Sequence, residues 1–97
     1  MADKKLPTSV KIGGHRWSVK LEDNLVEKRD ADGMCEIHHR RITVGGDADV
    51  DYQRQVLLHE IIEAIDLNYE MKLPHHKICT LEAALHQVLN DNDLGYR

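Results

Sequence analysis

The sequence contains no phenylalanine, and its one tryptophan and three tyrosines make up only 4% of the residues. So few aromatic side chains argue against a surface on which the bases of single-stranded nucleic acid stack. The basic excess that is usual in proteins that bind phosphate backbones is also missing, because the net charge is −4 with neutral histidines. We therefore expect no nucleic-acid partner.

Long apolar runs are missing as well. No segment approaches the roughly 20 apolar residues needed to cross a membrane, and no apolar secretory segment follows the polar start of the chain. The two cysteines, Cys35 and Cys79, are too few for a disulfide scaffold and fit reduced thiols in a cytosol. We expect no membrane partner and a cytoplasmic location.

The length suits a single modest core. A chain of 97 residues buries roughly 65% of the surface that its unfolded form exposes. With 41% apolar and 31% charged residues, the composition is that of a globular protein. Residues 1–97 are predicted to form one minimal domain with frayed ends at 1–8 and 93–97.

The N-terminal half shows the alternation of apolar and polar residues that is typical of β-strands. Four short segments alternate in this way: residues 10–12, 17–21, 34–38 and 42–44. The first two flank Gly13-Gly14, which can supply the positive φ of a tight turn, and we expect two antiparallel hairpins. Residues 25–28 fit either a strand or a helical turn.

From Asp49 onward the apolar period becomes helical. The segment from about Val50 to Tyr69 is apolar on one broad face and part of a second, which predicts a buried helix. Pro74 is well placed in the first turn of another helix, which carries an apolar stripe and ends near Asn92. The predicted fold is therefore α+β, with a small antiparallel sheet packed against two C-terminal helices.

The first helix carries the motif His59-Glu60-x-x-Glu63. His59 and Glu63 are four residues apart and project from one face, where an imidazole nitrogen and a carboxylate oxygen can bind one Zn²⁺. Glu60 projects about 100° away, which suits a general base that acts on water. These are the parts of metal-assisted hydrolysis. The simpler interpretation is an amphipathic helix with solvated glutamates and one histidine.

A catalytic zinc site needs a third protein ligand, and the second helix offers several. His75 and His76 open that helix, and we favour His75 because it shares a helical stripe with other polar residues. The candidates for the surrounding shell or for an alternative ligand are His76, Cys79, Glu82 and His86. For Cys79 the simpler interpretation is a small buried apolar side chain. The remaining histidines are expected to be exposed: His15, His38 and His39.

Residues 55–65, together with residues 81–92, resemble the small phage and prophage proteins that look like minimal zinc metallopeptidases of the gluzincin type. The similarity extends over about residues 42–92. In most of those proteins the helix reads His-Glu-x-x-His, and an acidic residue of the next helix is the third ligand. Here Glu63 stands at the second histidine and His75 falls near the acidic position. The resemblance thus implies a zinc site with the two ligand types exchanged, a peptide or protein substrate and a host bacterial cytoplasm.

The resulting hypothesis is a zinc metallopeptidase in which His59, Glu63 and His75 hold the metal and Glu60 is the base. The strand at residues 41–44 precedes the site helix and is expected to pair with an extended peptide. In a chain this short, a homodimer or a protein partner is expected to complete the site.

Two alternatives stay open. One is a non-catalytic module that binds a host or phage protein and in which zinc only joins the two helices. Such a structural site needs a fourth protein ligand, and Cys79 or Glu82 could serve. The other is a plain α+β binding domain without a metal.

Overall fold

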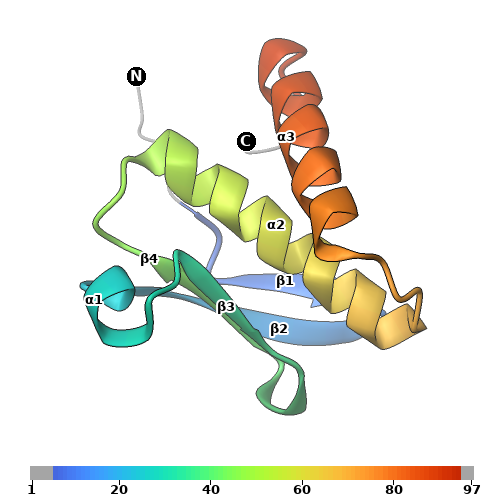
Figure 1. Cartoon of the computed structure of the whole chain (residues 1–97), viewed down its shortest axis with the longest axis horizontal. Coiled ribbons are helices and arrows are strands. Elements are labelled where there is room, and N and C mark those ends of the chain that lie inside the picture. The colour runs from blue at the N-terminus through green and yellow to red at the C-terminus, as the bar shows by residue number, and fades with distance from the viewer. Residues whose placement is uncertain (1–5, 95–97) are drawn as a thin grey trace.

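A computed structural model of the chain describes residues 6–94 (Figure 1). In chain order its elements are β1 (Ser9–Ile12), β2 (His15–Glu22), α1 (Leu25–Arg29), β3 (Gly33–Glu36), the 3₁₀ turn η1 (Ile37–His39), β4 (Arg41–Gly45), α2 (Val50–Tyr69) and α3 (His75–Asp91). The N-terminal half forms a sheet and the C-terminal half two helices, which confirms the α+β class. The segment at residues 25–28, left open between strand and helix, is helical and belongs to α1.

The strands form one sheet in the order β1-β2-β4-β3. Both expected hairpins are present, since β1 pairs antiparallel with β2 and β3 antiparallel with β4. The sheet is mixed rather than wholly antiparallel, because β2 and β4 run parallel, with Val19 opposite Ile42. The reason is the connection: α1 carries the chain to the far edge of the sheet, β3 runs back along that edge, and β4 returns in the direction of β2.

β4 occupies the interior of the sheet, with β2 on one side and β3 on the other. Its residues Ile42, Thr43 and Val44 are all buried, as expected for a central strand. The expectation that residues 41–44 pair with a substrate is therefore wrong, because both hydrogen-bonding edges of β4 are already used. The open edge on this side of the sheet belongs to β3.

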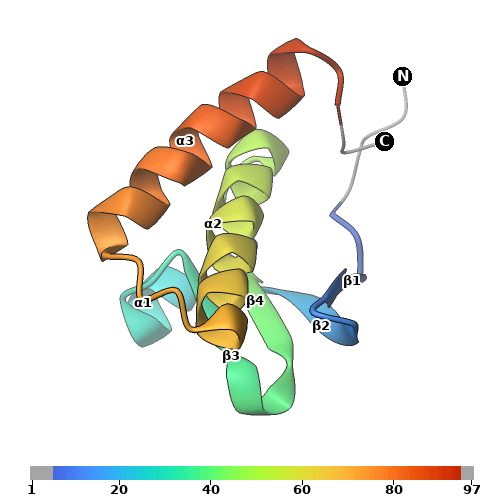
Figure 2. The same cartoon turned by 90° about the vertical axis from the view of Figure 1, so that its right-hand side faces the viewer.

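α2 packs along one face of the sheet and covers the core (Figures 1 and 2). Asp49 caps its first turn, because the carboxylate accepts a hydrogen bond from the amide of Tyr52 at 2.8 Å. The core cluster joins strand residues to the inward side of this helix: Ile12, Trp17, Ile42, Val44, Val56, Leu57 and Ala64. This burial fixes the helix, and with it the orientation of every side chain in the His-Glu-x-x-Glu motif.

α3 packs mainly against α2, which it crosses at an angle (Figure 2). In the connection, Glu70 and Lys72 adopt positive φ angles of 52° and 58°, and the amide of Leu73 donates to the carboxylate of Asp66 at 2.8 Å. This turn folds α3 back over α2, so that the first turns of α3 lie beside the His-Glu-x-x-Glu motif.

Part of the predicted fraying, at residues 1–5 and 95–97, lies outside the described residues; residues 6–8 and 93–94 belong to no helix or strand. Within residues 6–94, no helix combines the length and the apolar character needed to cross a bilayer.

Candidate metal centre

A cavity of about 440 Å³ lies between α2, α3 and the segment that leads into β3. Most of the candidate site residues line it: His59, Glu60, Glu63, His75, Cys79 and Glu82. The first three project from α2 and the last three from α3. The fold therefore brings the two halves of the predicted site to one place.

His59 is clamped between two carboxylates, one from each helix. Its Nε2 lies 2.8 Å from Oε2 of Glu63, as the spacing of four residues predicts, and its Nδ1 lies 2.8 Å from Oε1 of Glu82. The side-chain amide of Gln55 donates to the other oxygen of Glu82. Hydrogen bonds from α2 thus hold the side chain of Glu82 in place, and Glu82 in turn sets the orientation of the imidazole ring of His59.

The carboxylates also control the charge of His59. Burial by itself lowers the pKa of this imidazole, but the hydrogen bond to Glu82 and the negative charges of Glu60, Glu63 and Glu82 outweigh burial and raise the pKa above its usual value. Only a protonated ring can donate to both carboxylates at once. A cation that binds one ring nitrogen would therefore displace a proton from this cluster.

Glu60 lies deeper than the other residues of the motif, with 5% of its surface exposed. It packs against Gly33 of β3, where a Cβ atom would lie 2.9 Å from Oε2 of Glu60 and 2.6 Å from Cγ1 of Val56. Burial, followed by the negative charge of Glu63, raises the pKa of Glu60 to about 7. A carboxyl group with such a pKa can both accept and deliver a proton near neutral pH.

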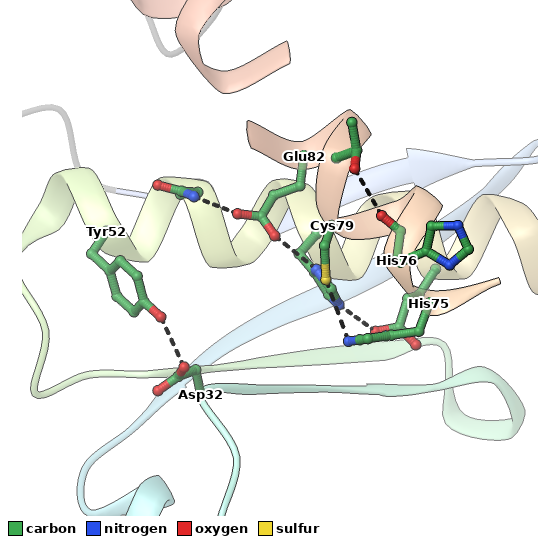
Figure 3. A network of polar contacts seen from close by, with 10 residues as sticks. Asp32, Tyr52, His75, His76, Cys79 and Glu82 are labelled. Atoms are coloured by element: carbon green, nitrogen blue, oxygen red, sulfur yellow. Dashed lines mark hydrogen bonds and ion pairs between the residues drawn. The ribbon is translucent and has the colours of Figure 1, made fainter. Parts of the chain in front are cut away.

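The α3 half of the site is built around His75 and Cys79. Nε2 of His75 lies 3.3 Å from Sγ of Cys79, and its ring meets that of His59 edge-on, with 5.4 Å between the centroids. Figure 3 shows His75, Cys79 and Glu82 projecting from α3 into the same polar network. A histidine, a thiol and a carboxylate therefore face the α2 motif.

Within the described part of the chain, two compact groups have the side chains to hold a metal ion. One consists of His59, Glu60 and Glu63, and the other of His59, Cys79 and Glu82; in each, one ligand atom per residue lies within 4.8 Å of the others. His75 belongs to neither group, although it lines the same cavity. Nitrogen, oxygen and sulfur are the donor types that zinc accepts, so the chemistry of either group is compatible with this metal.

No family model, curated protein or solved structure matches this chain. The resemblance to minimal zinc metallopeptidases therefore stays a prediction.

Two further candidates do not line the cavity. His76 is exposed on α3. His86 is buried one turn beyond Glu82, where its Nε2 lies 3.3 Å from Oδ1 of Asp51 and 3.1 Å from the side-chain amide of Asn90. It thus joins α3 to the start of α2. The remaining histidines are exposed, as predicted: His15, His38 and His39.

The far end of the cavity has polar residues that the sequence analysis did not single out. The hydroxyl of Tyr52 donates to Oδ2 of Asp32 at 2.8 Å, and Figure 3 shows this pair at the end opposite His75. Tyr52 precedes His59 by seven residues and so lies on the same face of α2, a signal that was present in the sequence. Asp32 had no such signal, because its place depends on the path of the chain into β3.

Proposed function

We propose that the protein is a zinc-dependent hydrolase that cleaves a peptide bond in a peptide or protein substrate. The observation that carries this proposal is Glu60, a buried carboxyl group beside an imidazole that two carboxylates hold in place. A metal that only joined two helices would give this group no role, whereas hydrolysis requires a base.

His59 and Glu63 from α2 would hold the zinc ion, with His75 from α3 as the third ligand. Nε2 of His59 faces Glu63, and Nδ1 is bonded to Glu82. This is the arrangement in which a carboxylate fixes the tautomer of a metal-binding imidazole, so Glu82 acts as a positioning residue. When bound, zinc would polarise the substrate carbonyl and lower the pKa of a water molecule.

Glu60 moves the proton. In its ionised form it accepts a proton from the attacking water, and in its protonated form it delivers that proton to the nitrogen of the departing amine. Its pKa of about 7 keeps both forms accessible at neutral pH. Gly33 leaves the space in which this side chain sits.

β3 offers the binding edge for an extended substrate. Among residues 6–94 it pairs on one side only, with β4, and its first residue, Gly33, lines the cavity next to Glu60. An extended peptide that adds to this edge as a further strand passes directly by the candidate base. This geometry supports a peptide substrate and moves the expected contact from β4 to β3.

The experiment compares the natural chain with Glu60→Gln, both purified without a His-tag. Each should bind about one zinc ion per chain by elemental analysis, because Glu60 is not a ligand in this proposal. Cleavage of an unbiased peptide library, read by mass spectrometry, should fall about 10²–10⁴-fold in the variant. Glu27→Gln on the exposed side of α1 changes charge equally and should cleave normally. Zinc-loaded natural protein that cleaves nothing would contradict the proposal.

A second candidate function is favoured by the group of His59, Cys79 and Glu82. In this alternative, zinc has four protein ligands, joins α2 to α3 and shapes a surface for a partner protein. Cys79→Ser distinguishes the two functions. The variant should lose zinc if Cys79 is a ligand of a structural site, whereas a hydrolase that holds zinc through His59, Glu63 and His75 should keep it. X-ray absorption of the zinc-loaded protein adds an independent readout, since a sulfur ligand at about 2.3 Å would indicate the structural site.

A further inference from the structure

α3 has an apolar stripe that faces solvent. Leu81, Leu85 and Val88 are 42%, 40% and 41% exposed, and their spacing of four and then three residues places them on one side of the helix. The contact with α2 borders this stripe, because Ile78, seven residues before Leu85, is buried, as is His86 on the side turned away from the stripe. A surface helix normally presents charged and polar residues to water. The exposed apolar stripe therefore indicates a surface that a binding partner covers.

The charged residues beside the stripe indicate what kind of partner binds there. Lys77 stands near the start of α3, Asp91 is its last residue, and Ala84 lies midway, seven residues from each. Residues spaced by seven lie close to one line along a helix. This line therefore carries a positive charge at one end, a negative charge at the other and a small side chain at its centre.

We propose that two copies of this chain associate through α3, with the two helices antiparallel and Ala84 at the centre. A two-fold axis at Ala84 places Lys77 of each copy opposite Asp91 of the other, and it brings Leu81 of each copy to within about 3 Å, along the helix axis, of the level of Leu85 of the other. A parallel pair would instead set like charges against each other. The same surface thus complements itself in charge and in apolar contact only when the helices run antiparallel.

The size of the contact sets its strength. A helix of 17 residues is about 25 Å long, and one helix pair buries less than the roughly 1,600 Å² of a standard interface. The dimer is therefore one that dissociates at low protein concentration. His75, Cys79 and Glu82 project from a different side of α3, so the association leaves the cavity open.

Sedimentation equilibrium of the whole chain, from low to high micromolar protein, tests the proposal. The natural chain should change from monomer to dimer over this range. Lys77→Glu and Asp91→Lys should each weaken the dimer about tenfold, because every dimer contains two such pairs. The double variant Lys77→Glu, Asp91→Lys should restore it, since each exchanged charge again meets its opposite. Lys28→Glu on α1, which changes net charge equally, should have no effect.

Leu85→Lys provides a second route, because it places a charge in the centre of the stripe on a solvent-facing side of the helix. It should abolish the dimer while the far-UV circular dichroism stays unchanged. A chain that is monomeric at all concentrations would overturn the proposal and assign the stripe to another occupant. A dimer that ignores Leu85→Lys, or that the double charge exchange fails to restore, would overturn it equally.

Discussion

The two long helices supply equal shares of the candidate site, but the fold holds them very differently. α2 lies on the sheet and buries six residues, among them Glu60, whereas α3 buries only Ile78 and His86. The side chains of the α2 motif therefore have fixed positions, while His75, Cys79 and Glu82 depend on how α3 rests on α2. We infer that α2 defines the site and that α3 completes and adjusts it.

The largest expected effect is a difference in the free energy of unfolding between two leucine-to-alanine variants, one on each helix. Leu57 of α2 is 2% exposed and Leu81 of α3 is 42% exposed. Leu57→Ala should cost about 2–5 kcal/mol through lost burial and a cavity, whereas Leu81→Ala should cost about 0.5 kcal/mol or less in the dilute monomer. Urea unfolding followed by the fluorescence of the buried Trp17 measures both. Equal losses would contradict the comparison.

Zinc affinity should show the same asymmetry. His59→Ala removes the imidazole that joins both carboxylates and should weaken zinc binding about 100-fold or more, whereas His75→Ala should weaken it about tenfold. Competition with a chromophoric chelator gives the two affinities, and His15→Ala, on the exposed part of β2, is the control. Full zinc binding by the double variant His59→Ala, Glu63→Ala would refute the site altogether.

The buried position of Glu60 predicts a pH-dependent cost. The pKa of Glu60 is about 7 in the fold against 4.5 as the ordinary value, so the fold holds this proton more tightly than the unfolded chain. The contribution of this proton to the free energy of unfolding is fully present below pH 4.5. It decreases as the pH rises towards 7 and stays low at higher pH. Glu60→Gln removes the penalty and should stabilise the metal-free protein by about 1–3 kcal/mol at pH 8.

The measurement for Glu60→Gln is urea unfolding in the presence of a chelator at pH 4.5 and pH 8. The gain should fall to a few tenths of a kcal/mol (about 0.4) at the lower pH, where Glu60 is protonated in the folded chain and about half protonated in the unfolded chain. A gain of the same size at both values would show that the raised pKa of this carboxyl is not its source.

The smallest effect concerns the turn that places α3. Glu70 has a φ of 52° at the end of α2, a left-handed conformation that costs a residue with a side chain more than it costs glycine. Glu70→Gly should therefore stabilise the protein by about 1 kcal/mol or less, and Glu70→Ala should not. Thermal unfolding of the two variants distinguishes them. A stabilising Glu70→Ala would point to removal of the charge instead.

What the sequence predicted well is what depends on neighbours along the chain. The bounds of α2 and the contact between His59 and Glu63 follow from helical spacing, and both β-hairpins follow from alternation around turns. The helical stripe favours His75 over His76 as the third ligand; His75 lines the cavity and His76 does not, and the role of His75 as a ligand stays a prediction.

What the sequence did not predict depends on segments that meet only in the folded chain. The central place of β4 follows from the path that α1 and β3 take, and no local pattern encodes that path. The same path brings Gly33 next to Glu60 and Asp32 next to Tyr52. The rotation of α3 about its axis decides that Cys79 and Glu82, rather than His75, form a compact group with His59, and periodicity alone does not fix that angle.

The strand order β1-β2-β4-β3 also affects the rate at which the chain folds. Each hairpin can close locally, but joining them brings Val19 to Ile42, far apart in the chain, and long-range closures of this kind are slow. We expect substitutions at this joint to slow folding, and substitutions on the lightly buried α3 to accelerate unfolding instead. Stopped-flow fluorescence of Trp17 separates the two rates. Because α3 buries so few residues, we expect it to separate from α2 before the sheet unfolds, and a zinc ion held by both helices would then be lost before the fold.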